Sequence, residues 1–382
     1  MTEVFIPKET ETGETRVAAT PETVQKMVKD GLAITVESDA GAASWFSDAA
    51  YEKAGARLVS GSDATQVWSS ADAVLVVRAP SPERAASMRE GAVLVGLLAP
   101  YKNADLTQSL AERGVTSLAM ELVPRISRAQ SMDALSSQAS IAGYKSVLLA
   151  AAELGRYFPL LMTAAGTIPP ARVVIMGAGV AGLQAIATAK RLGAIVEVSD
   201  IREAVKEQVE SLGGRFIELP LEESGEGEGG YAREMGEDFL RRQREIVTQH
   251  LHHANAAVTT ALVPGKPAPR LITAEMVHKM RPGAVIVDLA IEQGGNCELS
   301  RADEVVREGG VTILAPSNLA ATMPEDASTL YARNVFALLD LMVKEGELGL
   351  DLEDEVIAGS LLTHGGEIVH EPAAKSLQEV TP

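Results

Sequence analysis

The feature that most constrains the fold is a glycine-rich turn between an apolar run and an Ala-rich helical stretch. The apolar run ends at Met176, and Gly177, Gly179 and Gly182 follow it in the pattern Gly-x-Gly-x-x-Gly. The first glycine permits a tight turn, the second lets the backbone approach a pyrophosphate, and the third allows close packing of helix on strand. The first helical turn then offers its amides to phosphate oxygens. The turn predicts an α/β domain that binds a dinucleotide.

The acid that follows the next predicted strand bears on the choice of dinucleotide. Residues 195–199 form an apolar strand pattern, and Asp200 comes directly after it. A carboxylate there is expected to hydrogen-bond the adenosine ribose hydroxyls and to repel a 2′-phosphate, which favours NAD(H) over NADP(H). Arg202 leaves an alternative open, because a nearby arginine can accept a 2′-phosphate or form a solvated ion pair with Asp200 or Glu203.

Strand and helix patterns alternate along the chain in two series, which is typical of parallel α/β sheets. A long helix is expected at 132–154, a break between domains at the loop 163–170, and a returning helix at 327–343. We therefore predict two Rossmann-like domains with parallel sheets, joined by long helices with a cleft between them. The first domain comprises 1–138 plus 326–382, and the second, dinucleotide-binding domain comprises 139–325. Strands are expected at 2–6, 33–37, 73–77, 92–98, 116–120, 173–176, 195–199, 215–219, 256–260, 284–288 and 311–314, and the apolar face of the returning helix comprises Leu330, Val335, Leu338, Leu339 and Met342.

Composition excludes several classes of function. The chain has 34 basic and 52 acidic side chains and a net charge of −18, which disfavours binding to nucleic acid or anionic lipid. The single cysteine, Cys297, excludes an internal disulfide, and the six histidines show no pair at metal-ligand spacing, so no metal site is expected. No apolar run reaches the length of a membrane helix, so a soluble, cytoplasmic protein is expected. The Glu- and Gly-rich stretch 222–230 is expected to be a mobile loop.

Two further segments carry a resemblance to a known family. They are Met120–Gln138, which contains Arg-Ala-Gln-Ser-Met-Asp, and Thr260–Pro269. Together with 162–167 and the opening Pro-Lys-Glu…Arg-Val-Ala motif, they resemble the NAD(H)-binding first domain of proton-translocating nicotinamide nucleotide transhydrogenase, a soluble α-type subunit in many bacteria. The resemblance implies hydride transfer from NADH to NADP⁺ on a partner component, coupled to proton translocation by a membrane-spanning component. It also implies a homodimer, held at the inner face of the membrane through its partners only.

The same resemblance implies roles for individual residues. Gln130 would lie at the nicotinamide, and Arg125, Asp133 and Ser136 would hold the carboxamide and the nearby ribose. Gln130, Asp133 and Arg125 would serve the reaction, which needs close approach of two rings and no general acid or base. The alternative is that Arg125, Arg128 and Asp133 form a structural ion-pair network. Further carried-over cofactor contacts are Val180 at the pyrophosphate, Asp200 and Arg202 at the adenosine end, Gly230 and Tyr231 in a closing loop, and Gln243 and Leu262.

Alanine dehydrogenases also resemble this chain, in the opening motif, the glycine turn and the segment 286–295. Their reaction needs a histidine and a lysine, but Leu97 stands at the histidine position and Val76-Val-Arg78 at the lysine motif, while Glu292 replaces an aspartate. Arg16 matches, although a salt bridge with Glu9, Glu11 or Glu14 would also explain it. A third possibility is a module that binds NAD without turnover.

Overall fold

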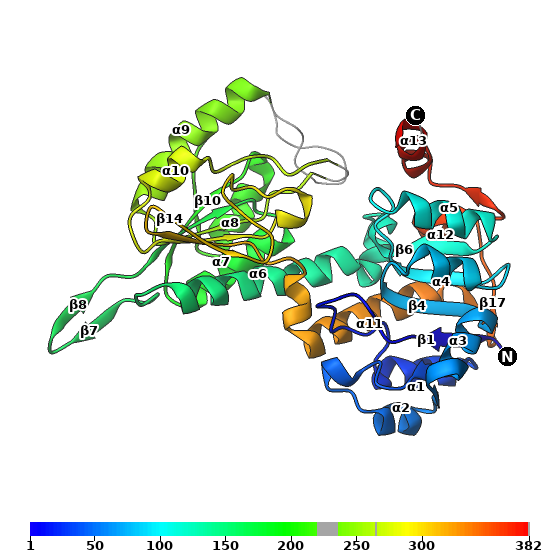
Figure 1. The fold of residues 1–382 in the computed structure, drawn as a ribbon. Coiled ribbons are helices and arrows are strands. Elements are labelled where there is room, and N and C mark those ends of the chain that lie inside the picture. Colours follow the sequence, from blue (N-terminus) through cyan, green and yellow to red (C-terminus); the bar gives the residue numbers. More distant parts are fainter. Residues whose placement is uncertain (220–235, 264–265, 381–382) are drawn as a thin grey trace. The chain divides into compact units, whose positions relative to one another are not determined.

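The chain divides into two compact units in a computed structural model that describes residues 1–219, 236–263 and 266–380. Unit 1 comprises Met1–Gln138 and Ala321–Pro382, and unit 2 comprises Ala139–Ala320. The first boundary lies inside the 20-residue helix α6 (Ala134–Glu153). The predicted fold class, α/β with two Rossmann-like domains, is confirmed. Figure 1 labels the elements of both units.

Unit 1 is built on an eight-stranded sheet in the order β19-β18-β6-β5-β4-β1-β2-β3. Strands β1 to β6 are parallel, with β1 in register between β2 and β4. Their order around β1 is that of a doubly wound nucleotide-binding sheet. The strands are β1 (Glu3–Ile6), β2 (Ala33–Glu37), β3 (Arg57–Val59), β4 (Ala73–Arg78), β5 (Val93–Leu97), β6 (Thr116–Ala119), β18 (Leu361–His364) and β19 (Glu367–Ile368).

Helices cover both faces of the unit 1 sheet, because its strands carry apolar side chains on both sides. One core contains residues of α1 (Pro21–Lys29), α2 (Asp48–Ala54), α11 (Pro324–Asp340) and α12 (Glu355–Ser360). The other contains residues of α3 (Gly61–Ser70), α4 (Pro82–Ser87), α5 (Ala104–Glu112) and α13 (Glu371–Val380). The returning helix is α11. Its predicted apolar face is buried except for Leu330, which is 36% exposed.

Unit 2 repeats this architecture with a seven-stranded sheet in the order β11-β10-β9-β12-β13-β15-β14. All neighbours are parallel except β14, which pairs antiparallel with β15 at the edge. Residues of α6, α7 (Val180–Arg191) and α8 (Lys206–Ser211) pack on one face, and residues of α9 (Glu237–His253) and α10 (Ala274–Lys279) on the other. The strands are β9 (Arg172–Met176), β10 (Ile195–Ser199), β11 (Arg215–Phe216), β12 (Ala256–Thr259), β13 (Val285–Asp288), β14 (Val305–Glu308) and β15 (Val311–Leu314).

Two expectations need correction. The sheets are not wholly parallel, because β14 at the edge of one sheet and β18 and β19 at the end of the other pair antiparallel with their neighbours. The segment 163–170 is not the break between domains. It contributes to an antiparallel hairpin of unit 2, β7 (Leu161–Thr163) and β8 (Gly166–Ile168), which extends beyond the rest of that unit (Figure 1). Gly166, at a φ of +126°, permits the tight reversal.

Short elements complete the two units. Unit 1 has a second small hairpin, β16 (Val343–Lys344) with β17 (Glu347–Leu348), and three 3₁₀ turns at η1 (Ala42–Ser44), η2 (Met120–Leu122) and η3 (Ser127–Met132). Unit 2 has η4 (Glu203–Val205) and η6 (Ile291–Gln293), and η7 (Leu319–Thr322) contains the second boundary. Among the described residues, no helix combines the length and the apolar character needed to cross a membrane.

Candidate functional site

The glycine turn of unit 2 joins β9 to α7. Each of its three positions requires or tolerates glycine for a different physical reason. Gly177 has a φ of +102°, and a Cβ there would lie 2.6 Å from the Thr260 Oγ1. A Cβ on Gly182 would lie 1.8 Å from the Gly177 carbonyl oxygen, so only glycine allows α7 to start this close to β9. A Cβ on Gly179 would meet no atom within 4 Å. Two of the glycines therefore shape the turn, and the third leaves room beside it.

The turn lies where the strand order reverses. The chain leaves β9 toward β10 on one side and later returns to β12 on the other side, and α/β sheets generally bind ligands outside the carboxyl ends of their strands at such a switch point. Backbone hydrogen bonds hold the turn to the strands on both sides. The Gly177 N–H donates to the Ser199 carbonyl of β10 (2.8 Å), and the Thr260 N–H after β12 donates to the Met176 carbonyl (2.9 Å). The amides of the first turn of α7, beginning with the 38% exposed Val180, have no acceptor within the helix. This geometry suits an anion such as a pyrophosphate.

Asp200 and Arg202 form a buried, bidentate ion pair at the end of β10. The Arg202 Nε and backbone N–H donate to the Asp200 Oδ1 at 3.0 and 2.8 Å, and the Arg202 Nη2 lies 2.7 Å from the Oδ2. The Oδ2 also accepts the Ala178 N–H at 2.6 Å. The side chains of Asp200 and Arg202 are only 4% and 13% exposed, so the pair is not the solvated one considered from the sequence. Asp200 thus ties the glycine turn to the tip of β10.

The loop after β12, which carries Leu262, is held by residues that the sequence analysis did not single out. The Asn296 side chain accepts the Ala261 N–H (3.0 Å) and donates to the Ala261 and Pro269 carbonyls (both 2.9 Å). Fully buried Asp288 in turn accepts the Asn296 N–H at 3.2 Å. Leu262 itself is 37% exposed. The sequence does contain a signal for these two residues: Asp288 ends the apolar strand pattern 284–288, and Gly-Gly-Asn296 follows a few residues later.

Gln243 lies on α9 and is 4% exposed. Its Nε2 lies 3.5 Å from the Ser199 Oγ, and its Oε1 is buried without a partner among the described residues. A buried carbonyl oxygen without a donor costs about 1 to 3 kcal/mol, so a donor from a ligand would stabilise it. Gly230 and Tyr231, predicted to belong to a closing loop, lie outside the described residues.

In unit 1, the segment that carries the predicted catalytic residues forms η3 and the start of α6. The Asp133 carboxylate caps α6, accepting the Ser136 N–H (2.8 Å) and the Ser136 hydroxyl (2.6 Å). Arg128 makes a bidentate pair with Asp354 (2.7 and 2.9 Å), which holds the Asp354 pKa well below its usual range. Of the residues in the alternative ion-pair network, Arg128 and Asp133 therefore have separate partners and do not pair with each other.

Gln130 is presented outward by this segment. Its neighbours Ala129 and Met132 are buried in the core of unit 1, whereas Gln130 and Arg125 are exposed. The Gln130 side chain makes no hydrogen bond to any residue in the described ranges, so its amide is available to a ligand. Of the three predicted catalytic residues, Asp133 is engaged in a local cap, while Gln130 and Arg125 are both exposed.

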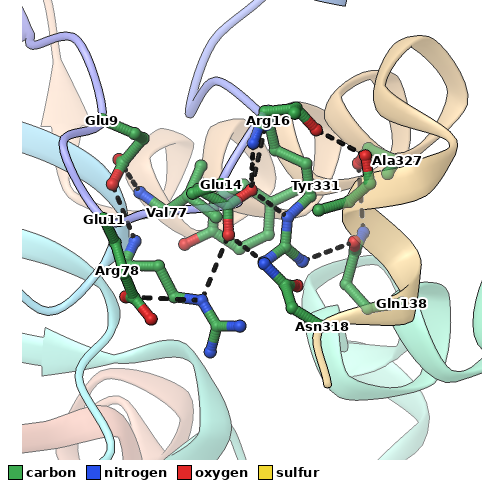
Figure 2. A network of polar contacts seen from close by, with 12 residues as sticks. Glu9, Glu11, Glu14, Arg16, Val77, Arg78, Gln138, Asn318, Ala327 and Tyr331 are labelled. Carbon is green, nitrogen blue, oxygen red and sulfur yellow. Dashed lines mark hydrogen bonds and ion pairs between the residues drawn. The ribbon is translucent and has the colours of Figure 1, made fainter. Parts of the chain in front are cut away.

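Arg16 of unit 1 lies in the polar network that Figure 2 shows. It is 3% exposed, and Glu14 is its partner among the three glutamates considered, with contacts of 2.6 Å to Nη2 and 2.8 Å to Nε. The Arg16 Nη1 also donates to the Gln138 Oε1 at 2.9 Å, and the Arg78 Nε donates to the Glu14 Oε2 at 3.1 Å. A keto-acid carboxylate would therefore have to displace Glu14 before it could bind Arg16.

Two further carboxyl groups of unit 1 are held by backbone amides. Glu9 accepts the Val77 and Arg78 N–H groups at 2.6 and 3.3 Å, and burial raises its pKa to about 7 (Figure 2). Glu121 accepts the Leu98 and Ala99 N–H groups at 3.1 and 2.5 Å, and burial raises its pKa as well. Both carboxyls thus brace strand ends of the sheet.

The histidines and acids of the described residues form no group of three that could hold a metal ion. His250 lies 3.3 Å from Glu197, and His278 lies 3.0 Å from Glu308. The His252 Nδ1 lies 2.8 Å from the Lys279 carbonyl. The contacts of His252 and His278 are at exposed positions of unit 2, whereas the Glu197 side chain that faces His250 is only 8% exposed.

Comparison with known proteins adds a family context to this geometry. The chain matches the family models described as "Alanine dehydrogenase/PNT, N-terminal domain" over residues 5–142 and "Alanine dehydrogenase/PNT, C-terminal domain" over residues 146–371. It is 50% identical to the first part of NAD(P) transhydrogenase subunit alpha from Rhodospirillum rubrum, over 96% of this chain and 97% of that protein. It is 30% identical to alanine dehydrogenase of Bacillus subtilis, over 98% and 94%. The crystal structure of transhydrogenase from Sinorhizobium meliloti superposes with a TM-score of 0.86 at 46% identity, covering 96% of this chain and 99% of that chain.

Proposed function

The chain belongs to the alanine dehydrogenase/PNT family, and on this premise we propose that it is the NAD(H)-binding subunit of a proton-translocating NAD(P) transhydrogenase. The higher identity to a transhydrogenase subunit than to alanine dehydrogenase favours this branch, 50% against 30%. One structural observation carries the proposal. A Cβ on Gly179 would meet no atom within 4 Å, which leaves room beside the turn for a pyrophosphate, whereas the arginine that a keto acid would need is paired with the chain's own Glu14.

Alanine dehydrogenases need a histidine and a lysine at two positions. The residues at these positions in this chain are compatible with hydride transfer between two cofactors. Leu97 ends β5 and has no ionisable group, and Val76 in β4 is buried. Alanine formation needs proton transfers to and from the substrate, whereas hydride transfer between nicotinamide rings needs only their orientation and close approach. When NADH is bound, it supplies the hydride, and the protein positions it.

The proposal assigns the following roles to individual residues, as the family resemblance implies them. The amides of α7 from Val180 onward would bind the pyrophosphate beside Gly177, Gly179 and Gly182. Gln243 would offer its unpartnered carbonyl oxygen to the nucleotide, and Leu262 would provide an apolar contact. Gln130 and Arg125 would orient the nicotinamide, while Asp133 and Ser136 act as a braced pair that can share a hydrogen bond with the carboxamide or ribose.

The pairing of Asp200 with Arg202 supports NAD(H) as the cofactor. The Arg202 guanidinium is turned onto Asp200 and is mostly buried, so it is not presented to a 2′-phosphate. Moving it toward a phosphate would leave the Asp200 charge buried without its cation, which is costly. A 2′-phosphate placed beside Asp200 would also be repelled.

The remaining elements of the proposal concern partners. The acceptor is NADP⁺ on a separate NADP(H)-binding component, and a membrane-spanning component couples the transfer to proton translocation. The chain acts as a homodimer in this complex and reaches the inner face of the membrane through these partners. The word "subunit" in the name of the R. rubrum relative supports an assembly of several chains.

Mixing the chain with the NADP(H)-binding component tests the proposal. The chain alone should bind NADH without oxidising it, and the mixture should transfer hydride from NADH to NADP⁺ in a stopped-flow experiment. Gln130→Asn should leave NADH affinity nearly unchanged and slow the transfer ten- to a hundredfold, about 1.4 to 2.7 kcal/mol. The shorter side chain keeps its amide but cannot hold the ring at the same place.

Gln25→Asn is the matched control, because Gln25 is exposed on α1 of the same unit. Its transfer rate should equal that of the wild type. No transfer in the mixture would reject the transhydrogenase proposal, and sustained NADH oxidation with pyruvate and ammonia would support alanine dehydrogenase instead. An unchanged rate in Gln130→Asn would remove only that residue from the mechanism.

A further inference from the structure

A basic hollow lies in unit 2, at the edge of the sheet opposite the glycine turn. It encloses about 920 Å³ and is formed at the amino ends of the parallel strands. Arg172 is the first residue of β9, Asn255 directly precedes β12, and Pro282 precedes β13. The ends of α9 and α10, which lie near each other in Figure 1, complete its wall. A volume of this size is within the range of small-molecule sites.

The lining of this hollow, as far as the structure describes the chain, carries cations and no acid, although the net charge is −18. The permanent cations are Arg156, Arg172, Lys279 and Arg281, and three histidines, His252, His253 and His278, lie among them. Such a concentration against the overall charge creates a local positive potential. Small anions are attracted to that potential.

Helix ends explain only part of this concentration. Cations are stabilised near the carbonyl ends of helices, which accounts for His252 and His253 on α9 and for His278 and Lys279 on α10. Lys279 and His278 also have acidic partners, Glu275 at 2.6 Å and Glu308 at 3.0 Å. The three arginines lie on no helix.

These arginines and Asn255 have hydrogen-bond donors that no acceptor among the described residues uses. The Arg156 Nε is buried without a partner among the described residues, although its Nη2 donates to the Pro169 carbonyl at 2.7 Å. Arg172 and Arg281 form no ion pair with any residue that the structure describes. The Asn255 side chain is buried and accepts the Arg172 N–H at 2.9 Å, while its Nδ2 makes no hydrogen bond within the described ranges.

We propose that this hollow binds a small molecule with two or more phosphate groups, at a site separate from the glycine turn. Guanidinium groups donate pairs of hydrogen bonds that match phosphate oxygens, which favours phosphate over other anions. The volume exceeds what a single phosphate fills, and the spread of the cations suits a diphosphate. The phosphate would also provide the acceptor that the Arg156 Nε lacks.

Calorimetric titration of the full chain with pyrophosphate at constant ionic strength tests this proposal. The titration is performed with and without saturating NADH, so that binding at the glycine turn is recognised by its competition with NADH. We expect one saturable site that persists with NADH, and at least a tenfold loss of affinity in the double variant Arg172→Gln, Arg281→Gln. Arg301→Gln, an exposed arginine of unit 2 outside the hollow, should bind like the wild type.

Several results would overturn the proposal. One is the absence of saturable binding in the presence of NADH, and another is an equal loss of affinity in Arg301→Gln. If the double variant loses binding to phosphatidylglycerol vesicles while pyrophosphate never binds, the hollow meets a membrane surface. If the double variant instead changes the sedimentation coefficient, the hollow is an interface between copies of the chain. The variant Arg172→Lys, Arg281→Lys keeps both charges and should retain some of the affinity, which separates loss of charge from loss of fold.

Discussion

The two units have the same strand order around their first strand but different loops after it. In each unit, this loop donates an amide to the acid at the end of the neighbouring strand. The Lys8 N–H donates to the Glu37 Oε2 at 2.9 Å in unit 1, and the Ala178 N–H donates to the Asp200 Oδ2 at 2.6 Å in unit 2. The shared contact indicates that both loops start in a similar way from similar sheets.

The loops then diverge. In unit 2, α7 begins at Val180, directly after the glycine turn. In unit 1, α1 begins only at Pro21, and Glu9 from the preceding loop binds the amides of Val77 and Arg78 at the end of β4. Unit 1 thus places a carboxylate at the end of β4, whereas unit 2 brings the first amides of α7 to its glycine turn. In this chain, only the short loop of unit 2 brings the start of the next helix to the switch point.

The largest effect is expected from a substitution that disturbs the packing on which the short glycine turn of unit 2 depends. Gly182→Ala would place a Cβ 1.8 Å from the Gly177 carbonyl oxygen, so the turn or α7 must move. We expect a loss of about 3 kcal/mol in the stability of unit 2, with loss of NADH binding. Urea unfolding followed by circular dichroism measures the first, and equilibrium dialysis the second.

Gly179→Ala is the control for this change, because its Cβ would meet no atom within 4 Å. It should keep the stability of the wild type and weaken NADH binding, since the methyl group occupies space beside the pyrophosphate. Equal stability of Gly182→Ala and Gly179→Ala would contradict the packing argument.

The buried Glu9 carboxyl of unit 1 should make the stability of the chain depend on pH. Burial raises the pKa of Glu9 from 4.5 to about 7, so the folded chain binds a proton that the unfolded chain releases between these values. The free energy of unfolding should therefore fall as the pH rises from about 4.5 to 7, by about 2 to 3 kcal/mol from this group. Glu9→Gln should remove that decrease and be more stable than the wild type at pH 8. Thermal unfolding between pH 5 and pH 8 measures the difference.

Glu52→Gln, at an exposed position of α2, controls for the loss of one negative charge. It should keep the pH dependence of the wild type. If Glu9→Gln also keeps that dependence, Glu9 is not the group responsible.

The smallest expected effect concerns the acids at the ends of β10 in unit 2 and β2 in unit 1, which are Asp200 and Glu37. NADH should bind about tenfold more tightly than NADPH, about 1.4 kcal/mol, because a 2′-phosphate meets Asp200 while Arg202 is already paired. Asp200→Asn should reduce this preference, whereas Glu37→Gln in unit 1 should leave it unchanged. Equilibrium dialysis with both nucleotides measures the ratio. Equal affinities in the wild type would assign Arg202 to the phosphate.

Much of the fold was predictable because its elements are apolar runs with clear ends. The predicted strands 33–37, 195–199 and 311–314 coincide with β2, β10 and β15. The hairpin of β7 and β8 was missed, since strands of three residues show no period and Gly166 is compatible with a loop. The strands β18 and β19, of four and two residues, were also missed.

The site was predictable where the constraint is local. The conformations of Gly177 and Gly182 follow from steric limits within a few residues, and the structure agrees with the expected reasons for both. The partner of Arg16 was not predictable, because Glu9, Glu11 and Glu14 are all near it in sequence and only the packed loop selects Glu14. The capping role of Asp133 likewise depends on the residue at which α6 begins.

The sequence by itself determined the two α/β units, the glycine turn and the candidate residues at its edges, because periodicity and glycine sterics act over short distances. Only the tertiary structure decided which charges meet. It selected Asp200 over Glu203 as the partner of Arg202 and buried that pair, and it brought Arg281 into one hollow with Arg156 and Arg172, which lie much earlier in the chain. The physical reason is that an ion pair or a hollow depends on which strands become neighbours. That choice is made by long-range packing, and no local pattern of residues records it.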